Sequence, residues 1–285
     1  MEIITDEDLE LKRAGFYWRA SQDYTGVRVL CCQPLEQDGF TNGFSTRTGG
    51  VSPFPQAALN LAGFSIDTSE NIFENRRRFL DVLNGNWTLA TCWQVHGADV
   101  CSVRDADDAS AKANERCDAL ITHAENVLLG VQTADCVPVL LGDERTGAAA
   151  AIHAGWRGTA ASIVAQTLQR MSEGFGTRAS DVSAAIGPAA SACCYEVGAE
   201  VIELFRERFS DADDLLTATR EGHALIDLQR ANRNQLVRAG VDASRIHTAP
   251  FCTMCRTDFF FSYRREKALH KRTGRLLSVI GRENG

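Results

Sequence analysis

Short apolar runs rich in β-branched residues predict six strands before residue 154. They cover Val27–Cys32, Val100–Val103, Ala119–Thr122, Val127–Gln132, Val137–Leu141 and Ala148–His153. Four of these strands lie between residues 117 and 153, too close together for intervening helices. This middle section is therefore expected to form a largely antiparallel sheet.

Helical spacing of apolar residues occurs elsewhere in the chain. A helix is expected to begin at Asp67–Glu70 and run to about Leu83. Three more are expected over Thr159–Met171, Gly198–Phe209 and Leu228–Ala239. The polar stretch Asp105–Arg116 is expected to be a loose connection between two strands. Strands segregated from helices predict an α+β fold, which we expect to be a layered α/β/β/α single domain over residues 1–285, with a largely antiparallel central sheet.

Composition narrows the class of protein. The 285 residues are 44% hydrophobic and 24% charged, with a net charge of −7. Such an acidic balance argues against general nucleic-acid binding. The first residues carry no export signal and no apolar run is long enough to span a bilayer, so the ten cysteines are expected to be reduced. We expect a cytoplasmic monomer with no nucleic-acid or membrane partner.

Three short motifs carry the chemistry that the sequence suggests. His96 lies in QVHG, Cys136 in TADC and His153 in HAGWRG. Two imidazoles and one thiol suit a catalytic Zn²⁺, which keeps one coordination position open. Cys136 precedes one predicted strand and His153 ends the next, so an antiparallel hairpin through Asp143–Gly147 would bring them together. The alternative is a small buried cysteine and a satisfied core histidine.

Two turns offer arginines for an anion. The turn after His153 combines Arg157 with N–H groups at the start of the predicted Thr159 helix, a favourable place for an oxyanion or phosphate. The glycine-rich segment STRTGGVS carries Arg47, and Asn60 follows in LNL. The alternatives are a plain strand-to-helix turn in the first case and a solvated arginine in the second.

Two further segments have competing interpretations. Cys252 and Cys255 form a CxxC pair, but no second CxxC is present and the adjacent Cys31–Cys32 and Cys193–Cys194 lack the separation that a zinc site needs, so structural thiols are expected. The segment Phe259–Arg265 mixes aromatic and basic residues, which would suit base stacking or a core strand with an exposed basic tip.

Many ordered motifs resemble those of the YfiH-like family, also called laccase-domain or multicopper polyphenol oxidoreductase proteins and more recently regarded as purine nucleoside phosphorylases. They include STRTGGVS, LNL, ENRRRF, QVHG, CDALIT, TADCVPVL, AAIHAGWRGT, AAIGPAASACCYEVG, CTMC, FFFSYRRE and TGRLLSVIG. KALHKR, between the last two motifs, is longer than expected for the family.

This resemblance implies that His96, Cys136 and His153 bind a catalytic zinc. It also implies phosphorolysis of adenosine, inosine, guanosine and S-methyl-5′-thioadenosine, with adenosine deamination as an additional activity. Purine nucleosides and phosphate would then be the partners, and Arg47, Asn60 and Arg157 are candidates to bind them. Asp118 and Asp135 are both candidates for the general acid, and the sequence does not choose between them.

Three alternative functions remain open at this stage. A copper polyphenol oxidase would need many histidines, and the chain has six, so one zinc is favoured over copper. A cysteine hydrolase would use Cys136 as nucleophile and His153 as base. A non-catalytic factor that helps to maintain peptidoglycan, a role attributed to some bacterial members of the family, would need neither.

Overall fold

The computed structural model describes residues 5–62 and 66–284. Over these residues the helices are α1 Asp6–Arg13, α2 Gln33–Gln37, α3 Ser69–Leu83, α4 Ala106–Lys112, α5 Trp156–Ala160, α6 Ile163–Phe175, α7 Ala199–Arg208, α8 Ala212–Leu215, α9 Leu228–Arg238 and α10 Tyr263–His270. The strands are β1 Phe16–Ala20, β2 Arg28–Cys32, β3 Thr41–Ser45, β4 Thr48–Ser52, β5 Thr88–Ala90, β6 Val100–Ser102, β7 Ala119–Thr122, β8 Val127–Thr133, β9 Val137–Asp143, β10 Ala149–Ala154, β11 Val182–Ile186, β12 Glu196–Gly198, β13 Leu216–Ala218, β14 His223–Ile226, β15 Ile246–Thr248 and β16 Leu276–Gly281.

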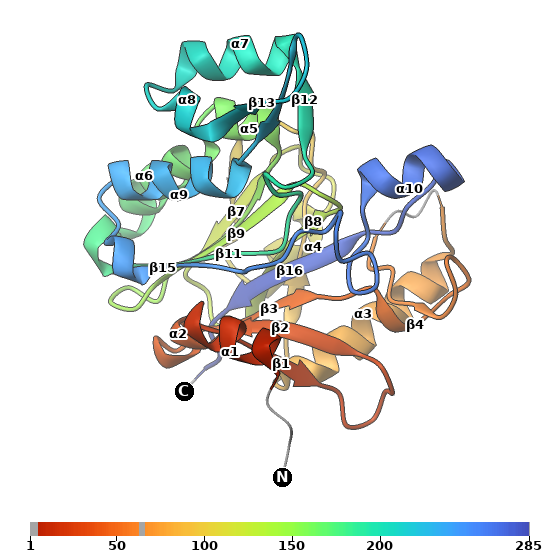
Figure 1. Cartoon of the computed structure of the whole chain (residues 1–285). Helices are drawn as coiled ribbons and strands as arrows, with labels where there is room; N and C mark the ends of the chain where they lie inside the picture. Colours follow the sequence, from red (N-terminus) through yellow and green to blue (C-terminus); the bar gives the residue numbers. More distant parts are fainter. Residues whose placement is uncertain (1–4, 63–65, 285) are drawn as a thin grey trace.

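Two six-stranded sheets form the centre of the molecule (Figure 1). The first has the order β1-β2-β3-β16-β8-β5 and the second β15-β11-β9-β10-β7-β6. Most neighbours are antiparallel, while β5 and β8, β6 and β7, and β11 and β15 pair in parallel. A third, small sheet has the order β12-β14-β13. The fold is therefore α+β with largely antiparallel sheets, as predicted.

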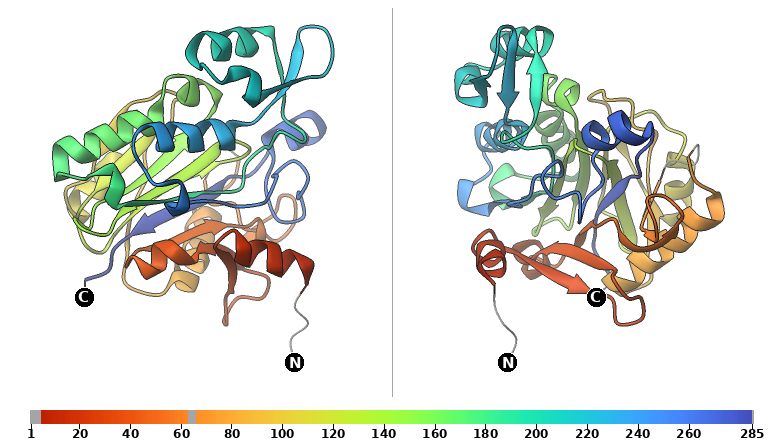
Figure 2. Two further views of the ribbon diagram at one scale, coloured as in Figure 1. Left: turned by 60° about the vertical axis from the view of Figure 1, so that its left-hand side comes forward. Right: turned by 45° about the vertical axis from the view of Figure 1, so that its right-hand side comes forward.

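The two large sheets pack face to face, with helices on their outer faces (Figure 2). Leu140 of β9 lies in the core between the sheets, whereas its neighbours Val139 and Leu141 pack toward α6. On the other side, Phe79 of α3 packs against the first sheet. Because both faces of β9 are covered, every residue of this strand is buried. This arrangement gives the four layers expected from the sequence.

Most of the predicted elements are present, with their ends shifted by one or two residues. Thr68 caps α3 through its side chain, and α9 begins after Asp227, whose carboxylate accepts the Arg230 N–H. Asp105–Arg116 does join two strands, but it is not a loose connection because α4 lies within it. Asp105 caps this helix, and Ala109 on its inner face is buried.

Two other expectations were wrong. The strands between residues 117 and 153 do not form one sheet, because β8 pairs with β16 in the first sheet while β7, β9 and β10 pair in the second. The helix expected over Thr159–Met171 is divided into α5 and α6. Ser162 has a φ of 60°, which interrupts the helical backbone between them.

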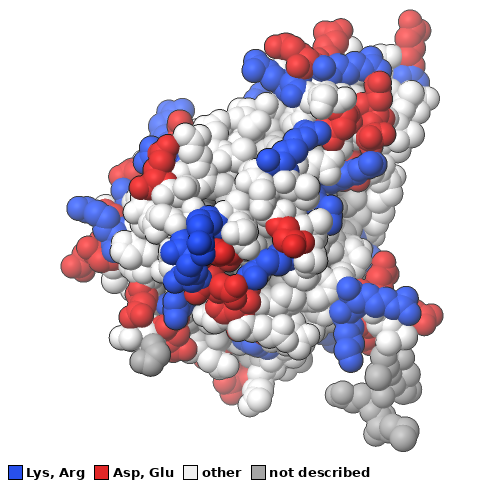
Figure 3. Space-filling view, turned by 90° about the vertical axis from the view of Figure 1, so that its left-hand side faces the viewer, with Lys and Arg blue, Asp and Glu red and all other residues white. Residues whose placement is uncertain are grey.

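The surface carries charges of both signs. Acidic and basic side chains are interspersed on the face shown in Figure 3. Neighbouring surface residues also form ion pairs, for example Arg178 with Asp181 at 2.7 Å. Among the described residues, no helix has the length and apolar character required to cross a bilayer.

Packing between the sheets should depend on Phe44 of β3. Phe44 is 1% exposed, and the centre of its ring lies 6.1 Å from that of Phe16. The ring also packs against Gly187, where an added Cβ would come within 2.3 Å of Phe44 ring atoms. We expect Phe44→Ala to lower the free energy of unfolding by about 3–5 kcal/mol, measured by urea titration. Val237→Ala, at a position 40% exposed on α9, is the control and should change it by less than about 0.5 kcal/mol. Equal effects of the two substitutions would contradict this assignment.

Candidate metal centre and adjoining cavity

His96, Cys136 and His153 lie together at one end of the two large sheets. A nitrogen of each imidazole and the Cys136 sulfur all lie within 4.8 Å of one another. The centroids of the two rings are 4.8 Å apart, and the ring planes meet at 72°. The three side chains therefore converge on one point, although they come from three separate segments.

The hairpin of β9 and β10 brings Cys136 beside His153. The strands pair antiparallel, with His153 opposite Pro138, and Cys136 directly precedes β9. Gly155 follows β10, where a Cβ would come within 3.0 Å of His96 Nδ1 and 3.2 Å of Cys136 Sγ. A glycine at this position therefore allows the backbone to approach the three side chains closely.

The buried carboxylate of Asp118 holds both histidines. It accepts hydrogen bonds from three consecutive backbone N–H groups, those of Val95, His96 and Gly97, at 3.2, 2.9 and 2.7 Å. These bonds fix a turn in which His96 has a φ of 59°. Asp118 also lies 2.8 Å from Nδ1 of His153, which leaves Nε2 of that ring as its ligand atom.

The side chains of Cys136 and His153 change each other's pKa. Burial alone would raise the pKa of the Cys136 thiol, but the His153 and His96 rings outweigh it and lower that pKa to about 6. Burial also disfavours the charged form of His153, yet Cys136 and Asp118 raise its pKa to about 9. Both changes favour the charged forms of this pair, the Cys136 thiolate and the His153 imidazolium. The thiolate is the form of cysteine that binds metals or acts as a nucleophile.

The three side chains open into a cavity of about 940 Å³. Its lining includes the arginines Arg76, Arg157, Arg264 and Arg275 and the aromatic residues Phe73, Trp93, Trp156, Tyr195 and Tyr263. Among the residues that the structure describes, Arg157, Arg264 and Arg275 form no ion pair with a carboxylate. The cavity therefore favours an anion and offers ring faces on which a flat group can stack.

Neither aspartate considered as a general acid has a carboxylate that faces this cavity without other partners. Asp118 is fully buried and lies outside the cavity lining. Asp135 lines the cavity, but its carboxylate accepts hydrogen bonds from the Thr253 and Ser262 hydroxyls at 2.7 and 3.1 Å and from the Arg264 N–H at 2.7 Å. Both carboxylates therefore act as positioning groups.

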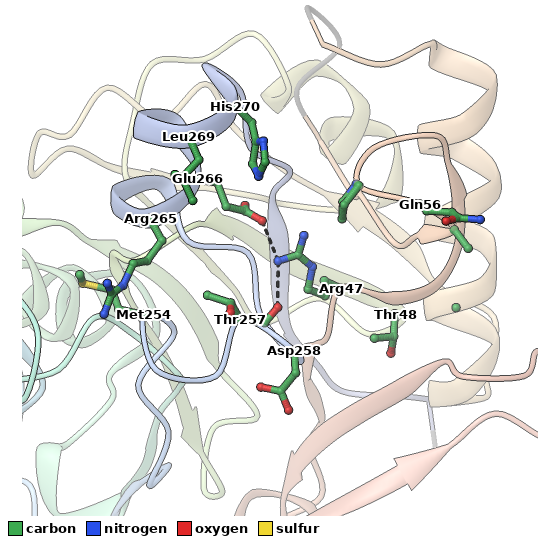
Figure 4. Close-up of a pocket in the computed structure, with 13 residues that line it drawn as sticks. Arg47, Thr48, Gln56, Met254, Thr257, Asp258, Arg265, Glu266, Leu269 and His270 are labelled. Atoms are coloured by element: carbon green, nitrogen blue, oxygen red, sulfur yellow. Dashed lines mark hydrogen bonds and ion pairs between the residues drawn. The ribbon is translucent and has the colours of Figure 1, made fainter.

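Two of the candidate phosphate contacts lie elsewhere. Arg47 lines a separate cavity of about 750 Å³, where it forms a 2.7 Å ion pair with Glu266 and donates to the Thr257 carbonyl at 2.9 Å (Figure 4). Asn60 is 2% exposed, and its Oδ1 accepts a hydrogen bond from the backbone N–H of Arg275 at 2.8 Å. Asn60 therefore reaches the cavity beside the metal centre only by holding Arg275.

The turn after His153 differs from the expected anion site. Its helix begins at Trp156 rather than Thr159 and ends at Ala160. Arg157 lines the cavity, and its guanidinium lies 4.0 Å from the centre of the Trp156 ring. From this turn, the side chains that line the cavity are therefore those of Trp156 and Arg157.

Part of the cavity was not anticipated from the sequence. The segment Phe259–Arg265 is not a strand: a turn leads into α10, so that Phe260 is buried while Tyr263 and Arg264 line the cavity. Arg275 was missed as well, although it stands in the TGR motif. Its role depends on contacts with residues distant in sequence.

The donor set fits a catalytic zinc site. Two imidazole nitrogens and one thiolate sulfur are ligands that Zn²⁺ accepts, and three protein ligands leave one position open toward the cavity. The remaining histidines, His123, His223, His247 and His270, belong to no ligand group within the described part of the chain. At this centre the geometry thus favours one metal over a multicopper cluster.

A family model described as multi-copper polyphenol oxidoreductase laccase matches residues 41–283. A purine nucleoside phosphorylase from Bacteroides thetaiotaomicron is 40% identical over 244 residues, covering 83% of this chain and 89% of the relative. Adenosine deaminase RL5, from an unknown prokaryotic organism, is 41% identical over 162 residues, covering 56% and 61%. The crystal structure of the hypothetical protein YfiH from Bacillus licheniformis superposes with a TM-score of 0.84 at 32% identity, covering 93% and 99%.

The role of Asp118 can be tested by metal affinity. Asp118→Asn should weaken zinc binding about 10–100-fold, because it loses the charge that orients His153 and the His96 turn. Competition with a chromogenic chelator measures this. The control is Asp99→Asn, which changes an exposed carboxylate in the loop that carries His96. This variant should bind zinc like wild type. Unchanged affinity in Asp118→Asn would show that the carboxylate does not support a metal site.

Proposed function

Because the chain belongs to the multi-copper polyphenol oxidoreductase laccase family, to which the YfiH and YlmD proteins also belong, we propose that it is a zinc-dependent purine nucleoside phosphorylase. The observation that carries this proposal is the opening of His96, Cys136 and His153 into one cavity lined by arginines and aromatic rings. The substrates we propose are adenosine, inosine, guanosine and S-methyl-5′-thioadenosine, with phosphate.

His96, Cys136 and His153 would hold the zinc. When bound there, zinc would supply a Lewis acid for a substrate oxygen and would lower the pKa of a bound water to about 7. Asp118 would keep His153 in the tautomer that presents Nε2 to the metal. Nothing in the donor set favours copper over zinc.

Arg275 and Arg157 would bind and orient phosphate. Burial lowers the pKa of the Arg275 guanidinium while the charge of Cys136 opposes that change, so an anion in the cavity would stabilise this cation. Arg275 is held at its backbone by Asn60. Phosphorolysis requires a phosphate oxygen to attack C1′ as the bond from C1′ to the purine nitrogen breaks, and a fixed guanidinium keeps that nucleophile aligned. Arg47 would take no part in binding phosphate at this site, because its charge is already neutralised by Glu266.

The aromatic lining would bind the nucleoside. Trp156, Tyr195 and Tyr263 line the cavity with both centres of charge, the thiolate and the arginines. Flat purine rings stack on such side chains with little dependence on their substituents. A lining of this kind would therefore accept several purine nucleosides rather than one.

Adenosine deamination is a second candidate activity. The similarity to adenosine deaminase RL5 favours it, although the match covers only part of each chain. The same three ligands would serve both reactions, since deamination needs a water activated at the metal. We also propose that the chain acts as a single-domain monomer in the cytoplasm.

Product analysis tests the phosphorylase directly. Inosine incubated with the zinc-loaded protein should give hypoxanthine and ribose 1-phosphate only when phosphate is present, as measured by chromatography. Cys136→Ala should abolish this turnover, whereas Cys101→Ala, a partly buried thiol outside the site, should retain it. Ammonia release from adenosine, measured without phosphate, reports deamination separately.

Three results would favour other functions. Full hydrolytic activity after metal removal, lost on alkylation of Cys136, would identify a cysteine hydrolase. Copper-dependent oxidation of phenols would identify a polyphenol oxidase. No turnover together with a cell-wall effect that survives Cys136→Ala would point to a non-catalytic peptidoglycan factor.

The phosphate site is tested by Arg275→Gln. Loss of a charge-assisted contact should raise the KM for phosphate about tenfold to a hundredfold, with a much smaller change in nucleoside KM. Arg178→Gln changes an exposed arginine and should leave both constants unchanged. Equal increases in the two KM values for Arg275→Gln would contradict a specific role in binding phosphate.

A further inference from the structure

Four cysteines that the proposed reaction does not use lie together beside the cavity. The sulfur atoms of Cys193, Cys194, Cys252 and Cys255 are all within 4.8 Å of one another. Cys255 Sγ lies 3.1 Å from Cys194 Sγ and 3.6 Å from Cys193 Sγ. The fold therefore supplies partners for the Cys193–Cys194 pair that the spacing within the pair did not indicate.

Parallel pairing of β11 with β15 explains why these cysteines meet. The segments that follow two parallel neighbouring strands leave the sheet at the same end. These two segments then run side by side, since Ala189 forms a bridge with Cys252 and the Ala189 carbonyl accepts the Thr253 N–H at 3.0 Å. Each segment next makes a tight turn that carries two cysteines. Sequence spacing alone could not indicate this contact.

We propose that Cys193, Cys194, Cys252 and Cys255 bind one Zn²⁺ as a closed four-thiolate site. With zinc–sulfur bonds of about 2.3 Å, sulfurs in a tetrahedron lie about 3.8 Å apart. The two shortest separations given above, 3.1 and 3.6 Å, are below that value and none of the others exceeds 4.8 Å, so small movements of the side chains suffice. Four protein ligands leave no open position, which is typical of a structural zinc and unlike the three-ligand centre of the cavity.

A backbone group near Cys252 favours the thiolate form that binds zinc. The Ser191 N–H donates to the Cys252 sulfur at 3.5 Å. Each thiol would release its proton to solvent as its bond to zinc forms.

Exposure of the cluster suits both entry and retention of an ion. Cys193 and Cys255 are exposed, so solvent reaches two of the sulfurs directly. Cys252 is buried and packs with Ala190 and Met254 in a small apolar cluster. A metal could therefore enter from one side and be held against a rigid base.

The proposed zinc would brace one wall of the cavity. Thr253 donates to the Asp135 carboxylate at 2.7 Å, and the Ala190 N–H donates to the Asp135 carbonyl at 2.9 Å. Asp135 has a φ of 86° and directly precedes Cys136. Tyr195, next to Cys194, lines the cavity itself. The cluster is thus a positioning element for the neighbouring site.

Metal analysis in Cys136→Ala protein tests the proposal, because this variant lacks the thiol of the other centre. Protein purified under reducing conditions with zinc should retain about one zinc that is lost when Cys252→Ser and Cys255→Ser are added. Adding Cys101→Ser instead is the matched control and should leave the zinc content unchanged. Equal zinc content with and without Cys252 and Cys255 would overturn the proposal, whatever the enzymatic activity of the protein.

Cobalt provides a second measurement that does not depend on how well the serine variant folds. Co²⁺ added to reduced Cys136→Ala protein should give thiolate-to-cobalt charge-transfer absorption that saturates at about one equivalent, and zinc should displace it. Absence of this absorption from folded protein in which the four thiols of the cluster are reduced would overturn the proposal. So would a disulfide between Cys194 and Cys255 that forms equally well in the presence of excess zinc.

Discussion

The carboxylate of Asp118 joins the candidate centre to the fold. The backbone carbonyl of Asp118 accepts the backbone N–H of His153 at 2.7 Å, and the Asp118 carboxylate contacts Nδ1 of the His153 ring. The other bonds of the carboxylate hold the turn that carries His96. Because a buried carboxylate without these partners would be costly, the turn, β7 and β10 must come together as one unit. The positions of both imidazoles follow from this constraint.

The two-sheet arrangement supplies the third ligand. β8 belongs to one sheet and β9 to the other, so the short connection between them crosses from layer to layer. Cys136 ends this connection beside His153, and Asp135 is fixed there by hydrogen bonds from Ser262 and Thr253. The segments that close the cavity come from distant parts of the chain, so the site forms only when both sheets are packed.

Local patterns in the sequence predicted the elements that depend on local interactions. The hairpin of β9 and β10, the capped start of α3 and the end of α9 are such cases. The assignment of β8 to a different sheet, the break at Ser162 and the meeting of Cys193 with Cys255 depend on contacts between distant segments. Periodicity and spacing carry no information about these. The same limit explains why the sequence indicated Arg47 and not Arg275, since only the fold shows that Glu266 neutralises Arg47.

Anomalous X-ray scattering at the zinc absorption edge, from crystals soaked with phosphate and a slowly cleaved inosine analogue, tests the central claim most directly. The account predicts an anomalous peak that marks a zinc ion bound by a nitrogen of His96, Cys136 Sγ and His153 Nε2. Phosphate should lie beside Arg275, and the purine should lie against the aromatic lining. A structure in which the three side chains point apart would contradict it. So would one in which zinc, phosphate and nucleoside bind elsewhere on the protein.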